Sequence, residues 1–426
     1  MPDFDLLIHG ATPHSAIGIA DGKIAALSDG TAREEIDATG LLVLPGVIDA
    51  HVHFNEPGRA DWEGLATGSR ACAAGGTTTF FDMPLNSTPP VIDAVSFAKK
   101  RAIAERESVV DFALWGGLVP GNLDELEALR DCGVIGLKAF MCPSGIDDFP
   151  MSDTATLRAG MKRAAELGLL VAVHAEIDHP ELRSGTTIRD HLDSRSIAIE
   201  LEAIALALDL AGESGCALHI VHVSSAAGVR LVQDAARQGV DVSCETCPHY
   251  LVLNEDDMER IGALAKCAPP IRDDFQRKQL IREVEIGNIL TIGSDHSPAP
   301  MSMKTNADFF KVWGGISGCQ HLLSLLFDLE IGPHRIALCT AENVADRFLL
   351  AERKGRIAPG LDADLVLLDP RGATEITEES LHYRHRQSAY IGRTLRGRIA
   401  RTILRGRTIA VGGKIAGNPR GQFIQP

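Results

Sequence analysis

The stretch VIDAHVHF, residues 47–54, decides the fold of this chain of 426 residues. It is a short apolar run with β-branched residues that ends in two histidines, as buried strands of parallel sheets do when they lead into a site. Seven further runs of this kind follow along the chain. The eight predicted strands cover residues 47–54, 78–83, 110–116, 134–140, 169–175, 218–223, 240–245 and 289–295.

Helical stretches separate these strands. Apolar residues recur at three- and four-residue intervals in residues 153–167, 196–211, 226–238 and 275–285. Eight alternating units predict an α/β fold, a (β/α)₈ TIM-like barrel that spans residues 46–351. A doubly wound open sheet is the alternative, but it normally has fewer strands and a Gly-rich phosphate turn after the first one, and that turn is absent here.

The two ends of the chain have a different pattern. Residues 1–45 and 352–426 contain short strand-like pieces separated by Gly, Asp and Pro turns, such as GIADGKIAAL and ARTILRGRTIAVGGK. We therefore expect both ends to pair into one small β-sandwich domain beside the barrel.

Composition narrows the class of partner. The chain is 45% hydrophobic and 23% charged, with a formal net charge of −15. Such a charge disfavours binding to nucleic acid and to anionic membranes, because both are negatively charged. A small-molecule substrate is therefore expected. No secretory leader and no apolar run of roughly 18 to 20 residues is visible, which predicts a cytoplasmic protein without a membrane partner. The nine cysteines, including the CxxC of Cys244 and Cys247, are expected to be free thiols.

Polar side chains gather at the carboxyl ends of the predicted strands, where barrel active sites are built. Alternate strand residues face the same way, so His51 and His53 can chelate one ion together. An isolated HxH pair is weak support, but four further residues of ligand type stand at the ends of other predicted strands. These are Lys138, His174, His222 and Asp295. Imidazole and carboxylate together suit Zn, Mn, Co or Fe(II) in an open site.

Lys138, in GLKAF, is the unusual member of this set. An unpaired ammonium is costly to bury, so a salt bridge or a misplaced strand boundary would each explain it. Beside a metal pair there is another reading, in which the neutral amine takes up CO₂ and becomes an anionic carbamate that bridges two cations.

These residues permit a hydrolytic mechanism. Two cations about 3.5 to 4 Å apart would hold a bridging hydroxide and polarise an amide carbonyl. Asp295 would take the proton of the hydroxide as general base and return it to the leaving nitrogen. The expected outcome is ring opening of a cyclic amide.

Several motifs carry a family resemblance. The segments LPGVIDAHVHFNEPGR, AAGGTTTFFDMPLNSTPP, GLKAF, VAVHAE, HIVHVSS, ETCPHYL, KCAPPIRD and IGSDHSP resemble the cyclic amidohydrolases, which include dihydroorotase, hydantoinase and allantoinase. The resemblance covers nearly the whole chain. It implies that His51 and His53 bind one metal, that His174 and His222 bind the other, and that carboxylated Lys138 bridges them. It further implies that Asp295 completes the first site, and that the protein is a homodimer or homotetramer.

The residues after the histidine pair discriminate between members of the family. Dihydroorotase-like sequences carry Arg two residues after the second histidine, to pair with a substrate carboxylate, and Asn55 stands there in this chain. The Asp-Met-Pro run typical of hydantoinases at this place is absent too. HVHFNEPGR, MPLNSTPP, SDHSPAP and WGGISG instead resemble the allantoinase group. The implied substrate is neutral allantoin, opened to allantoate.

A neutral ureide calls for amide and hydroxyl hydrogen bonds rather than a charge clamp. Asn86, Asn55 and Ser297 are the candidate substrate contacts, and Asn86 has the best support because it matches a substrate-binding Asn of the dihydroorotase relatives. The run PAPMSMKTNADFF, residues 298–310, is either a lid that excludes water or a surface loop.

Two alternatives stay open. One is a dihydroorotase or hydantoinase that acts on a related cyclic ureide. The other is a scaffold protein that kept the barrel and lost catalysis, although such proteins usually lose metal ligands and all six positions are filled here.

Overall fold

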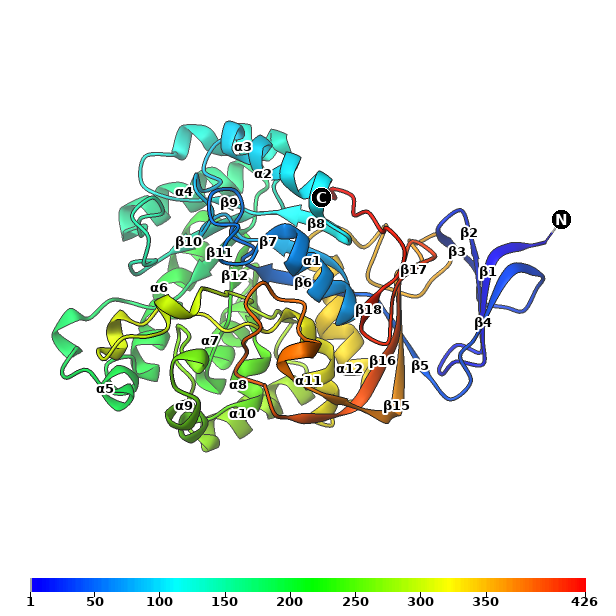
Figure 1. Ribbon diagram of the computed structural model, residues 1–426. Coiled ribbons are helices and arrows are strands. Elements are labelled where there is room, and N and C mark those ends of the chain that lie inside the picture. The colour runs from blue at the N-terminus through cyan, green and yellow to red at the C-terminus, as the bar shows by residue number, and fades with distance from the viewer. Residues whose placement is uncertain (1) are drawn as a thin grey trace.

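A computed structural model describes residues 2–426. It contains the predicted barrel, with helices around a ring of parallel strands (Figure 1). Every one of the eight predicted strand regions contains a strand, and the third strand of the barrel is divided into two short strands. The barrel strands are β6 Val47–Val52, β7 Thr77–Asp82, β8 Asp111–Leu114, β9 Gly116–Gly117, β10 Leu137–Phe140, β11 Val171–His174, β12 Leu218–Ile220, β13 Val242–Thr246 and β14 Thr291–Ile292.

The strands form two parallel sheets, β6-β7-β8 and β9-β10-β11-β12-β13-β14. The two sheets join where β8 leads through Trp115 into β9, which pairs with β10. At the other seam, Val52 pairs with His296 just after β14, and the amide of His53 donates to the carbonyl of His296 at 2.8 Å. The barrel therefore closes, and the open-sheet alternative is wrong.

The outer ring is helical. Its long members are α1 Leu65–Ala74, α2 Ala94–Glu107, α4 Thr154–Leu167, α6 Ile197–Ser214, α7 Ala226–Arg237 and α10 Asp274–Ile286. Shorter helices are α3 Leu126–Cys132, α5 Ile188–Asp193, α8 Pro248–Val252, α9 Glu255–Ile261, α11 Leu322–Asp328, α12 Pro333–Ala337 and α13 Asn343–Arg347. The four predicted helices correspond to α4, α6, α7 and α10. Local signals set their starts, since Asp153 and Asp273 each cap a first turn by accepting from a backbone amide.

Both chain ends contribute strands to the remaining sheets, which lie beside the barrel (Figure 1). One sheet has the order β3-β2-β1-β4 and the other β18-β17-β16-β15-β5. Their strands are β1 Phe4–His9, β2 Ala16–Ala20, β3 Lys23–Ala26, β4 Ala32–Asp37, β5 Leu42–Pro45, β15 Leu365–Glu375, β16 Thr394–Leu404, β17 Arg407–Val411 and β18 Lys414–Ile415. Buried side chains from both sheets share one apolar core. The predicted β-sandwich is present, while the boundaries at residues 45 and 352 stay a prediction.

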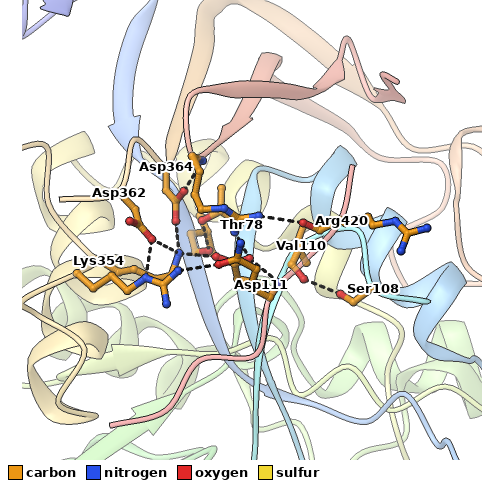
Figure 2. A network of polar contacts seen from close by, with 12 residues as sticks. Thr78, Ser108, Val110, Asp111, Lys354, Asp362, Asp364 and Arg420 are labelled. Carbon is orange, nitrogen blue, oxygen red and sulfur yellow. Dashed lines mark hydrogen bonds and ion pairs between the residues drawn. The ribbon is translucent and has the colours of Figure 1, made fainter. Parts of the chain in front are cut away.

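A buried ion network joins the base of the barrel to the β-sandwich (Figure 2). The ammonium of Lys354 lies 2.8 Å from a carboxylate oxygen of Asp111, which begins β8, and 3.4 Å from one of Asp362. It also pairs with Asp364, and Arg405 at the end of β16 pairs with Asp111. Burial alone would lower the pKa of Lys354, but the three carboxylates raise it above its ordinary value. The ammonium is therefore charged and holds the three acids together.

Removing this cation should destabilise the protein. Lys354→Met is expected to lower the free energy of unfolding by about 3 to 5 kcal/mol, because it leaves buried carboxylates without their counter-charge. Urea unfolding measures the effect, with the exposed Lys414→Met as matched control. A loss below about 1 kcal/mol, the size of an ordinary substitution, would show that the network contributes little.

Within residues 2–426, no helix combines the length and the apolar character that crossing a membrane requires.

Candidate metal centre and active site

A cavity of about 350 Å³ opens at the carboxyl ends of the barrel strands. Its volume is within the range of small-molecule sites. The six predicted ligand residues all line it, although they are spread over more than half of the chain. They are His51, His53, Lys138, His174, His222 and Asp295.

The first group of ligands comes from the end of β6 and the residues after β14. A carboxylate oxygen of Asp295 lies 3.2 Å from Nε2 of His51 and 3.4 Å from Nε2 of His53. The ligand atoms of all three residues lie within 4.8 Å of one another. Two side chains from the end of β6 and one from the residues after β14 therefore point at a common centre, as a chelate requires.

The orientation of His51 shows what this centre can hold. Its Nδ1 lies 2.7 Å from a carboxylate oxygen of Glu245 on β13, so Nδ1 carries the proton and donates it. In the neutral ring Nε2 then has a lone pair, and that lone pair faces the oxygen of Asp295. Two electron-pair donors at this separation repel each other unless a cation lies between them. The residues therefore fit a metal ion.

The second group comes from β11 and the turn after β12. Nδ1 of His174 lies 2.9 Å from Nε2 of His222. Glu176 fixes the tautomer of His174 in the same manner, because its carboxylate accepts from Nε2 at 2.9 Å. The nitrogen that faces His222 is thus a lone-pair donor. Two imidazoles converge here, and this pair fits a second ion.

Lys138 lies in β10 with a fully buried side chain, and its ammonium nitrogen has no hydrogen-bond partner among residues 2–426. Burial lowers its pKa to about 8, and the nearby carboxylates of Asp295 and Glu245 oppose that shift only in part. A neutral amine is the form that reacts with CO₂. Lys138 lies inside β10 and makes no salt bridge among residues 2–426, so neither a salt bridge nor a misplaced strand boundary accounts for it.

Asp295 is held in its charged form. Burial alone would raise its pKa, but positive charge on His51 and His222 and a hydrogen bond from His53 lower that pKa well below the ordinary value of a carboxyl group. When these rings are neutral, a cation bound between the side chains would act on this pKa in the same direction. Asp295 is therefore a carboxylate at neutral pH, the form that a proton acceptor needs.

Two of the candidate ligand residues have a rare backbone conformation. His222 has φ 41° and Asp295 has φ 45°, both in the left-handed region that non-glycine residues avoid. Each lies just beyond its strand, and the turn directs the side chain into the cavity. Such conformations cost on the order of 1 to 3 kcal/mol and concentrate at functional sites.

The three candidate substrate contacts have different surroundings. Asn86 and Ser297 line the cavity, and the amide nitrogen of Asn86 lies 3.4 Å from Nδ1 of His53. Asn55 is fully buried and is not part of the cavity wall. Its side-chain amide points to the carbonyl of Pro298 at 3.4 Å. The structure thus brings Asn86 and Ser297 together beside the candidate ligand residues, and the role of Asn55 stays a prediction without contact support.

Sequence reasoning missed the residues that orient the ligands. Glu245 holds His51, while Glu176 holds His174 and is itself bound by Arg195, whose Nε donates at 3.0 Å. A signal existed for Glu176, since HAE places it two residues after His174, at same-face spacing. The sequence held no such signal for Glu245, because it lies 194 residues from His51.

Other clusters of ligand-type residues have different explanations. Asp111, Asp362 and Asp364 lie close enough to hold an ion, but the ammonium of Lys354 occupies their centre. Cys244 and Cys247 are buried in the core, and all nine cysteines are free, as predicted.

Known proteins resemble this chain in sequence and in fold. The model of the amidohydrolase family matches residues 42–409. An allantoinase of Rubrobacter xylanophilus is 52% identical, with 100% of this chain and 98% of the relative covered. An allantoinase of Solibacter usitatus is 50% identical, with 98% and 94% covered. Among solved structures, the L-hydantoinase (dihydropyrimidinase) of Arthrobacter aurescens superposes with a TM-score of 0.96 at 32% identity, covering 99% of this chain and 100% of that one.

Proposed function

Because the chain belongs to the amidohydrolase family, we propose that it is a hydrolase that opens the cyclic amide of allantoin to give allantoate. The observation that carries the proposal is the convergence of four histidines, a buried lysine and a carboxylate in one cavity. Full-length relatives named allantoinase, at 41% identity and above, support the choice of substrate.

The residues would hold two divalent ions. We propose that His51, His53 and Asp295 bind one ion, that His174 and His222 bind the other, and that Lys138 joins them as a carbamate. Zinc is the first candidate, with Mn, Co and Fe as alternatives that the same ligand types accept. Ions bound there supply Lewis acidity, which polarises the amide carbonyl and makes water a better nucleophile at neutral pH.

The chain's own groups carry the proton. Asp295 is a carboxylate beside the lone pairs of His51 and His53, so it can accept a proton from the attacking water at its free oxygen. It then returns that proton to the ring nitrogen as the amide bond breaks. Glu245 and Glu176 keep His51 and His174 in the tautomers that leave their facing nitrogens unprotonated.

Asn86 and Ser297 are the proposed hydrogen-bonding groups for the ureide. We expect Asn86→Ala to raise KM for allantoin roughly tenfold, because one hydrogen bond to a buried substrate is lost, worth about 1 to 1.5 kcal/mol. Steady-state kinetics measure this effect, with Asn418→Ala, an exposed residue outside the barrel, as control. An unchanged KM would remove Asn86 from the substrate contacts.

Initial rates on allantoin, dihydroorotate and hydantoin, measured side by side, test the function. The protein is loaded with Zn, Mn or Co in the presence of bicarbonate. We expect metal-dependent opening of allantoin, with the other two substrates at least about a hundredfold slower in kcat/KM. A preference for dihydroorotate would contradict the reading of Asn55 and revive that alternative.

Metal analysis of the purified protein tests the scaffold alternative. A scaffold would carry no stoichiometric transition metal, whereas the proposal expects two ions for each chain. Analytical sedimentation of the same sample measures the mass of the assembly and so tests the predicted dimer or tetramer.

A further inference from the structure

One wall of the catalytic cavity is a segment with little regular structure. Residues 310–315 all line the cavity, and they follow the start of the 3₁₀ turn Phe309–Lys311. This wall continues the run of residues 298–310, for which the sequence left a lid and a surface loop as alternatives. We call residues 309–315 the cavity wall segment.

Two buried lysines hold this segment. The ammonium of Lys266 donates to the main-chain carbonyls of Phe309 at 2.7 Å, Phe310 at 3.1 Å and Val312 at 2.6 Å. The ammonium of Lys304 donates to the carbonyls of Trp313 at 3.0 Å and Gly315 at 2.7 Å. Five of the seven carbonyl oxygens of the cavity wall segment are thus bound by two side chains.

These lysines are expensive to bury. Lys266 is 6% exposed and Lys304 is 5% exposed. Within residues 2–426 the acceptors of both ammonium groups are main-chain carbonyls, with no carboxylate among them. An apolar side chain of the same length would be cheaper to bury at either position. A methionine, however, has no N–H group and could not fix the directions of several carbonyl groups at once.

The conformation of the cavity wall segment also shapes the site. The amide of Gly315 donates to the carbonyl of Lys266 at 2.7 Å, so main chain and side chain of Lys266 both bind the segment. A Cβ at Gly315, where φ is 129°, would lie 2.1 Å from the carbonyl oxygen of Ser297. Trp313 meets Trp62 edge to face, with ring centroids 5.0 Å apart. A shift of the segment would therefore change the space available beside the metal ligands.

We propose that Lys266 and Lys304 are positioning residues for substrate binding, which fix the cavity wall segment in the shape that receives the ureide. The identity of the ureide rests on the proposed function, but the fixed conformation of the segment does not. The segment is then a clamped wall rather than a freely moving surface loop.

Lys304→Met and Lys266→Met test this proposal in the metal-loaded protein, with exposed Lys162→Met as matched control. The first readout is KM against kcat for allantoin. We expect KM to rise at least about tenfold while kcat changes less than about threefold, because the segment lines the cavity but contains none of the six candidate ligand residues. Metal content should equal that of the parent, since none of the six ligands belongs to the segment.

The second readout needs no turnover. The near-ultraviolet circular dichroism of the Trp62–Trp313 pair should change in both variants and stay constant in the control, because the indole geometry depends on the segment. The chain has only three tryptophans, and the third, Trp115, lies in the barrel core. If the parent protein does not open allantoin, the proposed function fails, while this signal still decides whether the lysines fix the segment.

Two results would overturn the proposal. In the first, the lysine variants have the same kinetic constants and dichroism as the control and differ only in a lower Tm. The lysines would then have a purely stabilising role. Changed dichroism with unchanged KM would show a fixed segment that does not govern substrate binding. If Lys266→Met fails to fold, Lys304→Met carries the test, since among the described residues its ammonium binds only Trp313 and Gly315.

Discussion

Asp295→Asn is expected to lower kcat for allantoin by at least about a thousandfold and to leave the fold intact. The amide keeps the size of the carboxylate and one oxygen ligand, but it cannot accept the proton of the attacking water. General base catalysis is worth about 10² to 10⁴ in rate, and the loss of charge at a metal ligand adds to the effect.

Steady-state rates, metal content and circular dichroism are measured on the same preparation of this variant. Metal content separates the loss of the base from the loss of an ion. Asp29→Asn, an exposed residue of the β-sandwich, is the control. Near-normal turnover in Asp295→Asn with two ions bound would rule out Asp295 as the proton carrier, and another acceptor in the cavity would have to be sought.

Lys138→Ala is expected to abolish activity by a similar or larger factor. If the carbamate joins two ions, its loss removes an anionic ligand from both, and bound metal should fall below two ions for each chain. The Lewis acidity of the pair is worth several kcal/mol, and about 4 kcal/mol corresponds to a thousandfold in rate. The folded barrel should persist, because the substitution removes a buried amine that has no hydrogen-bond partner among residues 2–426.

Carbon-13 spectroscopy tests the carbamate directly. Protein loaded in ¹³C-bicarbonate should show one carbamate signal that is absent from Lys138→Ala and present in Lys162→Ala, an exposed control on α4. A parent protein with two ions and full activity but no such signal would contradict the carboxylated lysine and leave the other ligands in place.

The sequence predicted the order and number of the barrel strands well and their ends poorly. The run 289–295 contains only the two-residue strand β14 Thr291–Ile292, and the run 134–140 contains β10 Leu137–Phe140. Buried residues on either side of a strand are as apolar as the strand itself, so hydrophobicity alone does not mark the end. At Asp295 the chain leaves the sheet through a left-handed residue, which a pattern of residue types does not encode.

Alternation explains why His51 and His53 face the same cavity, but the sixth strand ends before His222. The odd spacing of His219 and His222 would turn their side chains to opposite faces of one continuous strand. β12 ends at Ile220, and His222 has a positive φ, so the rule no longer applies at His222. His219 instead supports the site, with Nδ1 2.7 Å from the hydroxyl of Ser243 and Nε2 4.0 Å from Glu245.

The sequence by itself determined the barrel, the two-ended β-sandwich and the six residues that meet in the cavity. Strand periodicity is local, and parallel strands bring their carboxyl ends to the same edge whatever the loops do. Only the tertiary structure decided which residues support that set. Glu245 under His51, Lys266 and Lys304 behind the cavity wall segment, and Lys354 among three aspartates are contacts between distant segments. Asn55 turned away from the cavity for the same reason: the direction of a side chain in a turn depends on the packing around it, which no local pattern contains.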